Sequence, residues 1–135
     1  LEYDISLDRA LVSRFQVDIR YDHVYVDLDD TLVTQDGVDP LLAAFLFQCR
    51  NQGKKLHLLT RHGGNAPETL ALNALAGVFH TVTQVTGEQR KSAYITFRDA
   101  IFIDDSFSER REVHQALGIP VFAPDAVESL LDWRR

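Results

Sequence analysis

The sequence predicts an α/β domain in which helices cover both faces of a parallel β-sheet. Two observations lead to this prediction. Short apolar segments alternate with segments of helical pattern along almost the whole chain. The short segments are apolar throughout, which is typical of strands that are buried on both faces rather than on one. The expected architecture is a three-layer α/β/α sandwich, and 135 residues suffice for one such domain.

The first half of the chain contains two predicted strands, and each is followed by a helix. Residues 1–22 form a lead-in without a clear pattern. Asp39 and Pro40 indicate the start of the first helix, because aspartate is a preferred N-cap and proline suits the first helical position. Gly53 and Gly77 indicate where the two helices end. In order, the predicted elements are a strand at 24–28, a helix from 41 to about 51, a strand at 56–60 and a helix at 67–76.

The second half alternates in the same way. Residues 100–103 are purely apolar, and Gly118 marks the end of the helix that follows them. The spacing of Asp125 and Glu128 is that of a capping box, which indicates the start of a last helix. In order, the predicted elements are a strand at 82–85, a helix at 88–97, a strand at 100–103, a helix at 109–117, a strand at 119–122 and the helix that Asp125 opens.

The composition is that of an ordinary globular domain, with 45% hydrophobic and 25% charged residues. The formal net charge of −6 argues against binding to nucleic acids or to anionic membranes. Cys49 is the only cysteine, so an internal disulfide is excluded, and a reducing, cytoplasmic location is expected. No apolar segment approaches the roughly 20 residues that a membrane-spanning helix needs.

Three aspartates crowd the end of the first predicted strand. Residues 24–33 read VYVDLDDTLV, so Asp27, Asp29 and Asp30 follow directly on apolar, β-forming residues. Neighbouring carboxylates repel one another and resist desolvation, so such a cluster needs a reason. One interpretation is structural: the aspartates make the turn and cap the next segment. The other is chemical: the cluster binds a divalent cation and acts on a group attached to it.

Other reactive residues also follow predicted strands, which favours the chemical interpretation. Ligands of parallel α/β sheets bind at the carboxyl ends of the strands. Thr60 ends the second predicted strand, Asp104 and Asp105 follow the strand at 100–103, and Lys91 lies between them in the sequence. Carboxylates suit Mg²⁺, whereas a hydroxyl and an ammonium group suit phosphoryl oxygens. The sequence therefore predicts a site for Mg²⁺ and a phosphorylated ligand.

This ordered set resembles the four motifs of the haloacid dehalogenase (HAD) superfamily, whose members are mostly Mg²⁺-dependent phosphatases. The segment DLDDT, which begins at Asp27, is similar to the DxDxT signature of the first motif. Thr60 resembles the second motif, Lys91 the third, and Asp104 with Asp105 the acidic pair of the fourth. The resemblance implies a Rossmann-like sheet and the hydrolysis of a phosphomonoester through an aspartyl-phosphate.

The resemblance also implies a role for each side chain. Asp27 attacks phosphorus, and Asp29 first protonates the leaving oxygen and then takes a proton from the attacking water. Thr60 and Lys91 hold the phosphoryl group. A carboxylate that attacks an anionic phosphate needs a cation between the two, which fits a requirement for Mg²⁺. The implied ligands of Mg²⁺ are Asp27, Asp29 through its backbone carbonyl, Asp104 and Asp105.

Several neighbouring residues keep more than one interpretation. Asp30 is expected in the turn, and Thr31 either binds substrate or hydrogen-bonds within the loop. Arg90 stands beside Lys91, so the third-motif cation is one of these two residues. Asp105 binds Mg²⁺ either directly or through water.

Arg61 and His62 follow the second motif in the segment TRHGGN. They either contact the substrate or belong to a glycine turn before Asn65 caps the next helix. The remaining histidines show no metal-ligand spacing and are expected to be structural: His23, His57, His80 and His114.

The connections leave no room for the cap domain that many HAD enzymes carry. Only VTQDGVD separates Leu32 from the helix at Pro40, so residues 34–38 are expected to form the only built-in flap. We expect an open site that takes a small or macromolecular phosphorylated substrate, with a neighbouring domain or subunit acting as a lid.

Two other functions remain open from the sequence. A non-catalytic module of a larger protein would use the pocket only to bind Mg²⁺ or a phosphorylated ligand. A phosphotransferase would pass the phosphoryl group to an acceptor other than water. Hydrolysis is the favoured prediction because no motif residue is substituted. The chain has no methionine, and therefore no initiator, so we expect a single domain excised from a longer polypeptide.

Overall fold

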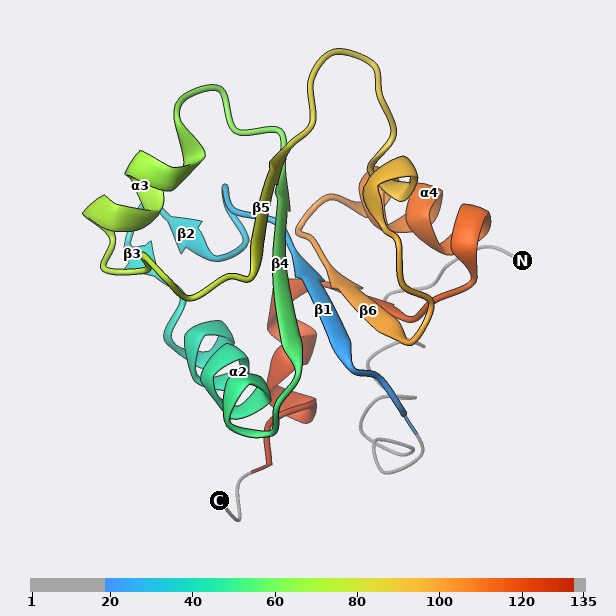
Figure 1. The fold of residues 1–135 in the computed structure, drawn as a ribbon, viewed down its shortest axis with the longest axis horizontal. Coiled ribbons are helices and arrows are strands. Elements are labelled where there is room, and N and C mark those ends of the chain that lie inside the picture. Colours follow the sequence, from blue (N-terminus) through green and yellow to red (C-terminus); the bar gives the residue numbers. More distant parts are fainter. Residues whose placement is uncertain (1–18, 133–135) are drawn as a thin grey trace.

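The computed structural model describes residues 19–132, which form a five-stranded parallel sheet flanked by helices (Figure 1). This confirms the predicted α/β class. Across the sheet the strands are β5 (Thr81–Gln84), β4 (Lys55–Thr60), β1 (His23–Val26), β6 (Ala100–Ile103) and β7 (Val121–Phe122). The strand at the centre is therefore β1, and its carboxyl end lies between those of β4 and β6.

A short antiparallel hairpin, β2 (Val33–Thr34) and β3 (Gly37–Val38), follows β1 and occupies the position of the predicted flap. Within the described residues, the α-helices are α2 (Pro40–Asn51), α3 (Ala66–Leu72) and α4 (Phe107–Leu117), and the 3₁₀ helices are η2 (Lys91–Tyr94) and η3 (Pro124–Ser129). In residues 19–132, the helices all fall short of the length and hydrophobicity that crossing a bilayer requires.

The sheet separates two hydrophobic cores, and its strands contribute to them alternately. Along β1, Val24 and Val26 face the core beneath α2, α3 and η3, whereas Tyr25 faces the core beneath α4 and η2. Along β6, Ile101 and Ile103 face the first core and Phe102 the second. Burial of both faces explains why these strands carry uninterrupted apolar sequences.

Two helix boundaries follow the predicted chemistry. The Asp39 carboxylate accepts hydrogen bonds from the N–H groups of Leu41 and Leu42 at 3.0 and 3.1 Å, with Pro40 as the first helical residue of α2. Gly118 has the left-handed φ of +73° that ends α4. The start of α2 and the end of α4 could therefore be predicted from the local sequence alone.

The predicted helix at 88–97 is wrong, because only the single 3₁₀ turn η2 forms there. Gly87 has a φ of +61°, and Arg90 is extended. Arg61 donates hydrogen bonds to the carbonyls of Gly87 and Gln89 at 3.3 and 2.6 Å. These carbonyls are thereby bound by the side chain of Arg61, which directly follows β4, rather than by helical N–H groups, and the chain enters η2 with Lys91 buried.

Other predicted boundaries need smaller corrections. The last element is a 3₁₀ helix that starts at Pro124 without a side-chain cap, so Asp125 lies inside it and forms no capping box. The helix predicted at 67–76 ends at Leu72, because Ala74 adopts a left-handed φ of 59°. The strand predicted at 82–85 is shifted by one residue and forms an edge of the sheet. The helix predicted at 109–117 begins earlier, at Phe107.

Candidate active site

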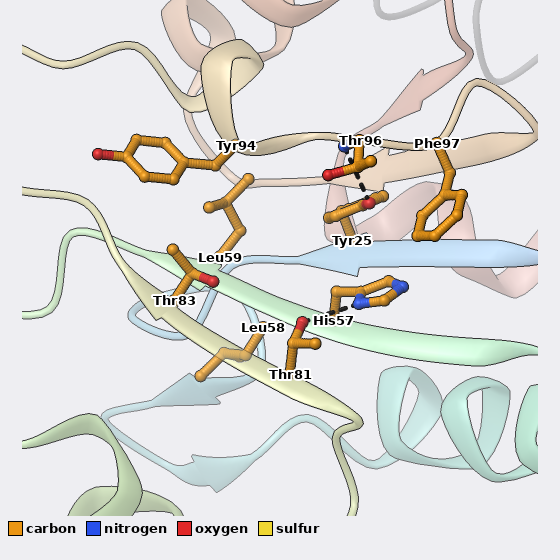
Figure 2. Close-up of a pocket in the computed structure, with 9 residues that line it drawn as sticks. All are labelled: Tyr25, His57, Leu58, Leu59, Thr81, Thr83, Tyr94, Thr96 and Phe97. Atoms are coloured by element: carbon orange, nitrogen blue, oxygen red, sulfur yellow. Dashed lines mark hydrogen bonds between the residues drawn. The ribbon is translucent and has the colours of Figure 1, made fainter.

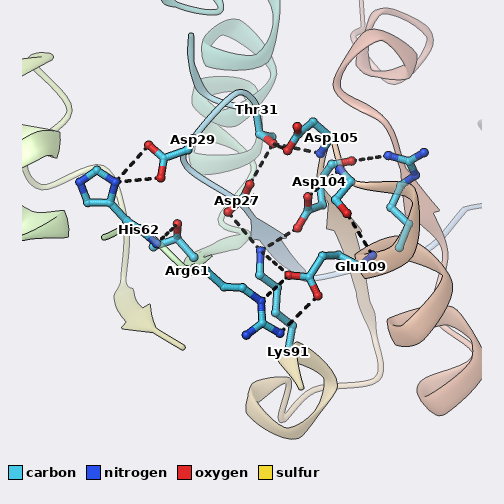
Figure 3. A network of polar contacts seen from close by, with 12 residues as sticks. Asp27, Asp29, Thr31, Arg61, His62, Lys91, Asp104, Asp105 and Glu109 are labelled. Atoms are coloured by element: carbon cyan, nitrogen blue, oxygen red, sulfur yellow. Dashed lines mark hydrogen bonds and ion pairs between the residues drawn. The ribbon is translucent and has the colours of Figure 1, made fainter. Parts of the chain in front are cut away.

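Polar side chains from three adjacent strands meet at the carboxyl edge of the sheet (Figure 3). Asp27 follows β1, Thr60 ends β4, and Asp104 follows β6. The backbone N–H of Asp27 donates to the carbonyl of Ile103 at 3.0 Å, which continues the parallel pairing beyond β1. Strand order therefore brings together residues that lie far apart in the sequence.

Lys91 enters this cluster from η2 (Figure 3). Its Nζ donates to Asp104 Oδ2 at 2.7 Å and to Asp27 Oδ1 at 3.1 Å, and it lies 3.7 Å from Glu109 Oε2. Lys91 is 1% exposed, whereas the neighbouring Arg90 is exposed. Of the two candidate cations, Lys91 is the one in the cluster.

The cluster carries more negative than positive charge. Burial raises the pKa of Asp27, although Lys91 opposes the rise. Burial, and then the charge of Asp27, raise the pKa of Asp104 to about 7. Burial alone would lower the pKa of Lys91, but Asp104 and Asp27 together raise it. One ammonium group thus faces two buried carboxylates, and further positive charge would stabilise their ionised forms.

Three carboxylates are placed to share a cation. Asp27, Asp104 and Asp105 each offer one oxygen, and these oxygens lie within 4.8 Å of one another. Oxygen ligands of this kind fit Mg²⁺, which commonly binds one or two carboxylates together with water and phosphate oxygens. The donor set and the shortage of positive charge therefore both fit the predicted metal.

Thr31 ties the loop after β1 to the loop after β6. Its hydroxyl lies 2.9 Å from Asp105 Oδ1 and 3.2 Å from Asp27 Oδ2, and it accepts a hydrogen bond from the N–H of Asp105 at 3.0 Å. Thr31 is fully buried. Of the two interpretations of Thr31, these contacts support the one in which it holds the loop. Asp30 lies in the turn with a φ of 58°.

Asp29 and His62 form a pair at the rim of the pocket (Figure 3). His62 Nδ1 lies 2.8 Å from Asp29 Oδ2 and 3.0 Å from Oδ1, and His62 Nε2 lies 2.8 Å from the hydroxyl of Thr69. The side chain of Asp29 is 51% exposed. The backbone N–H of His62 also donates to Thr60 Oγ1 at 3.1 Å, so the hydroxyl keeps its own proton to donate, and a hydrogen bond from Thr60 is one of the contacts that oppose the rise in the pKa of Asp27.

The guanidinium group of Arg61 is engaged by protein groups. Its Nε donates to Glu109 Oε2 at 2.6 Å, in addition to its two bonds to backbone carbonyls at Gly87 and Gln89. Arg61 therefore links the end of β4 to the first turn of α4 and to the segment before η2. Arg61 lines the pocket, but its guanidinium group is directed at Glu109 and at the segment before η2.

The residues that hold Asp104 were not predicted from the sequence. Asp104 Oδ1 accepts a hydrogen bond from the N–H of Ser106 at 2.9 Å, and the Asp104 carbonyl accepts one from buried Arg110 at 2.7 Å. A signal existed, since Ser106 and Glu109 have capping-box spacing and Ser106 is the N-cap of α4. Placing the helix start there would have brought its first turn beside the acidic pair.

The cluster opens into a pocket of about 390 Å³. Its lining contains most of the predicted site residues and the first turn of α4: Asp27, Asp29, Thr60, Arg61, Lys91, Asp104, Asp105, Ser106, Ser108 and Glu109.

A second pocket, of about 160 Å³, lies on the sheet face near residues 94–97 (Figure 2). His57 Nδ1 is 2.7 Å from the hydroxyl of Thr81 there, and Nε2 is 2.9 Å from His23 Nδ1. These contacts fit the structural role predicted for both histidines. The acidic residues line only the first of these two pockets, which makes it the candidate active site.

Comparison with known proteins indicates the fold and leaves the activity open. No family model matches the chain, and no curated protein matches it. Among solved structures, an uncharacterized protein from Corynebacterium glutamicum is similar, with a TM-score of 0.53 at 18% sequence identity. The match covers 76% of this chain and 82% of the other. At this identity the likeness supports a shared α/β fold alone.

Proposed function

We propose that this domain is a HAD-type, Mg²⁺-dependent phosphohydrolase that cleaves a phosphomonoester through an aspartyl-phosphate. One observation carries the proposal: Lys91 Nζ lies between Asp27 and Asp104 in a pocket that also contains Thr60. Four groups with the chemistry of phosphoryl transfer thus converge from separate elements, in the sequence order of the four HAD motifs.

Asp27 is the proposed nucleophile. A carboxylate oxygen of Asp27 forms a bond to phosphorus while the bond from phosphorus to the ester oxygen breaks. Lys91 and the hydroxyl of Thr60 bind the phosphoryl oxygens, on which negative charge is concentrated. Mg²⁺, held by Asp27, Asp104 and Asp105, would supply the positive charge that lets two anions approach each other.

Asp29 is the proposed general acid and base. It gives its proton to the departing ester oxygen, and its carboxylate then accepts a proton from the water that attacks phosphorus. That attack breaks the bond between phosphorus and Asp27, releases inorganic phosphate and leaves Asp29 protonated again. Half-exposure of Asp29 at the pocket rim suits a group that meets both the leaving group and water.

The short connections around the pocket support a substrate that is large, or one that is covered by a neighbouring domain or subunit. Between β1 and α2 only the β2–β3 hairpin intervenes, and between β4 and β5 only α3. Within residues 19–132, neither connection contains a cap. A neighbouring domain or subunit would then complete the site and select among phosphorylated small molecules or macromolecules.

The proposal is tested by phosphate release from sugar phosphates, nucleotides, a phosphopeptide and 4-nitrophenyl phosphate, with Mg²⁺ or with EDTA. Asp27→Asn keeps the shape of the side chain and removes the nucleophile, so turnover should fall at least about a thousandfold. Asp99→Asn, in an exposed residue before β6, is the matched control and should leave the rate unchanged. Equal rates for the wild type and Asp27→Asn on every ester would overturn the proposal and favour a binding module.

A further inference from the structure

We propose that His62 is a positioning residue that aims the Asp29 carboxyl group at the leaving oxygen. This inference rests on the proposed function, in which Asp29 is the general acid. It assigns His62 to Asp29 rather than to the substrate. The geometry points to this role through a chain of three side chains, Asp29, His62 and Thr69 (Figure 3 shows the first two).

The hydrogen bonds among these three side chains favour one tautomer of the His62 imidazole. Both Asp29 oxygens lie within 3.0 Å of His62 Nδ1, and a carboxyl oxygen that carries no proton can only accept, so we assign the ring proton to Nδ1, which can donate to Asp29 even when the other Asp29 oxygen holds the catalytic proton. In the neutral ring Nε2 then accepts, and the hydroxyl of Thr69, 2.8 Å away, is its donor. Thr69 lies on α3, so a helix fixes the far side of the ring.

The turn that carries His62 is itself held by the side chain of Gln84. Gln84, at the end of β5, donates from Nε2 to the carbonyls of His62 and Gly64 at 3.1 and 2.7 Å. Its Oε1 accepts from the N–H of Ala66 at 3.1 Å. A Cβ at Gly64 would lie 3.4 Å from His62 Nε2, in van der Waals contact, so the backbone of the turn passes close to the ring. These contacts hold the glycine-containing turn in one conformation and thereby fix the position of His62.

Asp29 needs such a support because its carboxyl group is half exposed. A general acid works only when its proton points at the leaving oxygen, and a misplacement of about 1 Å can cost about a hundredfold in rate. The backbone N–H of His62 holds Thr60 Oγ1 independently of the ring. Truncation of the imidazole should therefore affect Asp29 while the phosphate-binding hydroxyl keeps its contact.

Two aryl esters of similar shape separate this role from a general loss of structure. Phenyl phosphate has a poor leaving group that needs protonation, whereas 4-nitrophenyl phosphate has a good one that does not. His62→Ala should lower kcat for phenyl phosphate about thirtyfold or more and kcat for 4-nitrophenyl phosphate less than about threefold, with KM little changed. An equal loss on both esters, or no loss on either, overturns the inference.

Further variants locate the effect in the chain of side chains. His62→Asn places an amide N–H close to the position of Nδ1 and should restore most of kcat for phenyl phosphate. Thr69→Val removes the donor to Nε2 and should cause a smaller loss on the same ester. In an Asp29→Asn background, His62→Ala should have no additional effect, because the group that it aims is gone. His114→Ala, in the last turn of α4, controls for histidine removal elsewhere.

A measurement without turnover separates failure of this inference from failure of the proposed function. Two-bond ¹H–¹⁵N correlations of the neutral imidazole should give the Nδ1–H tautomer of His62 in the wild type and a shift toward Nε2–H in Asp29→Asn. An Nε2–H tautomer in the wild type would contradict the inference even if no ester is hydrolysed. Absence of turnover with the Nδ1–H tautomer present would overturn the proposed function alone.

Discussion

Lys91 Nζ lies 2.7 Å from Asp104 Oδ2, and neither side chain is more than 2% exposed. An ion pair removed from water in this way is costly to form and still more costly to break, because the remaining partner is then buried without a counter-charge. Asp27 shares the same ammonium group, so one side chain compensates two carboxylates. The stability of the domain and the proposed chemistry therefore depend on the same residue.

Replacing Lys91 should destabilise the domain in a manner that depends on metal. Lys91→Met keeps the aliphatic chain but leaves Asp27 and Asp104 without their cation. It should lower the free energy of unfolding by about 3 kcal/mol in EDTA, measured by urea denaturation. In Mg²⁺ the loss should be smaller, since the metal supplies positive charge at the same carboxylates. Arg90→Met, at the exposed neighbour, should change the free energy by less than about 0.5 kcal/mol.

Mg²⁺ should stabilise the wild type through the three carboxylates. At a free concentration a hundred times the Kd, a ligand that binds only the folded state raises the free energy of unfolding by about 2.7 kcal/mol. Thermal unfolding with and without Mg²⁺ measures this shift. Asp105→Asn keeps the shape of a ligand and removes its charge, so its midpoint should respond less to Mg²⁺ than that of Asp99→Asn. An unchanged midpoint in the wild type at high Mg²⁺ would exclude the metal site.

His57 should make the domain less stable on mild acidification. Burial, and then the nearby His23 and His80, lower the pKa of His57 from the usual 6.5 to about 4. As the pH falls, His57 takes up a proton in the unfolded chain near pH 6.5 but in the folded domain only near pH 4. The stability that neutral His57 provides is therefore complete above about pH 6.5 and is lost progressively as the pH falls toward about 4. Urea denaturation across this range should show a shallower decline in His57→Gln than in the wild type. His114→Gln, in the last turn of α4, controls for the loss of a histidine elsewhere.

Arg61 should act on the segment that carries Lys91. Arg61→Ala frees the carbonyls of Gly87 and Gln89, so amide hydrogen exchange in residues 87–91 should become faster. Displacement of Lys91 should then lower kcat by about tenfold to a hundredfold with a smaller change in KM. If Arg61 instead binds the substrate, KM should rise while exchange in this segment stays the same. Arg50→Ala, which removes an arginine bound to the carbonyls of Gly77 and Val78, is the matched control.

The parts of the fold that local sequence encodes were predictable. The strand at 100–103 has the expected bounds because all of its residues are apolar and both faces of the sheet are covered. Asp39 begins α2 through its side chain, and Gly118 ends α4 through its left-handed backbone conformation. The cluster of aspartates was predictable for a related reason, since each member directly follows a buried strand.

The parts that depend on distant residues were not predictable. Residues 88–97 contain good helix formers, but Arg61, which binds the carbonyls of Gly87 and Gln89, favours an extended segment before Lys91. The contact of His62 with Asp29 joins two loops that are 33 residues apart, and it depends on the position of Gln84 at the edge of the sheet. No local pattern specifies such a contact.

The most direct test of the account is to trap the covalent intermediate on Asp27. During turnover in Mg²⁺, the reaction is quenched and the protein is reduced with borohydride, which converts an aspartyl-phosphate to homoserine. Peptide mass spectrometry should find homoserine at position 27 in the wild type and none in samples without substrate. Turnover by the wild type with an unmodified Asp27, or with the modification at another carboxylate, would contradict the account.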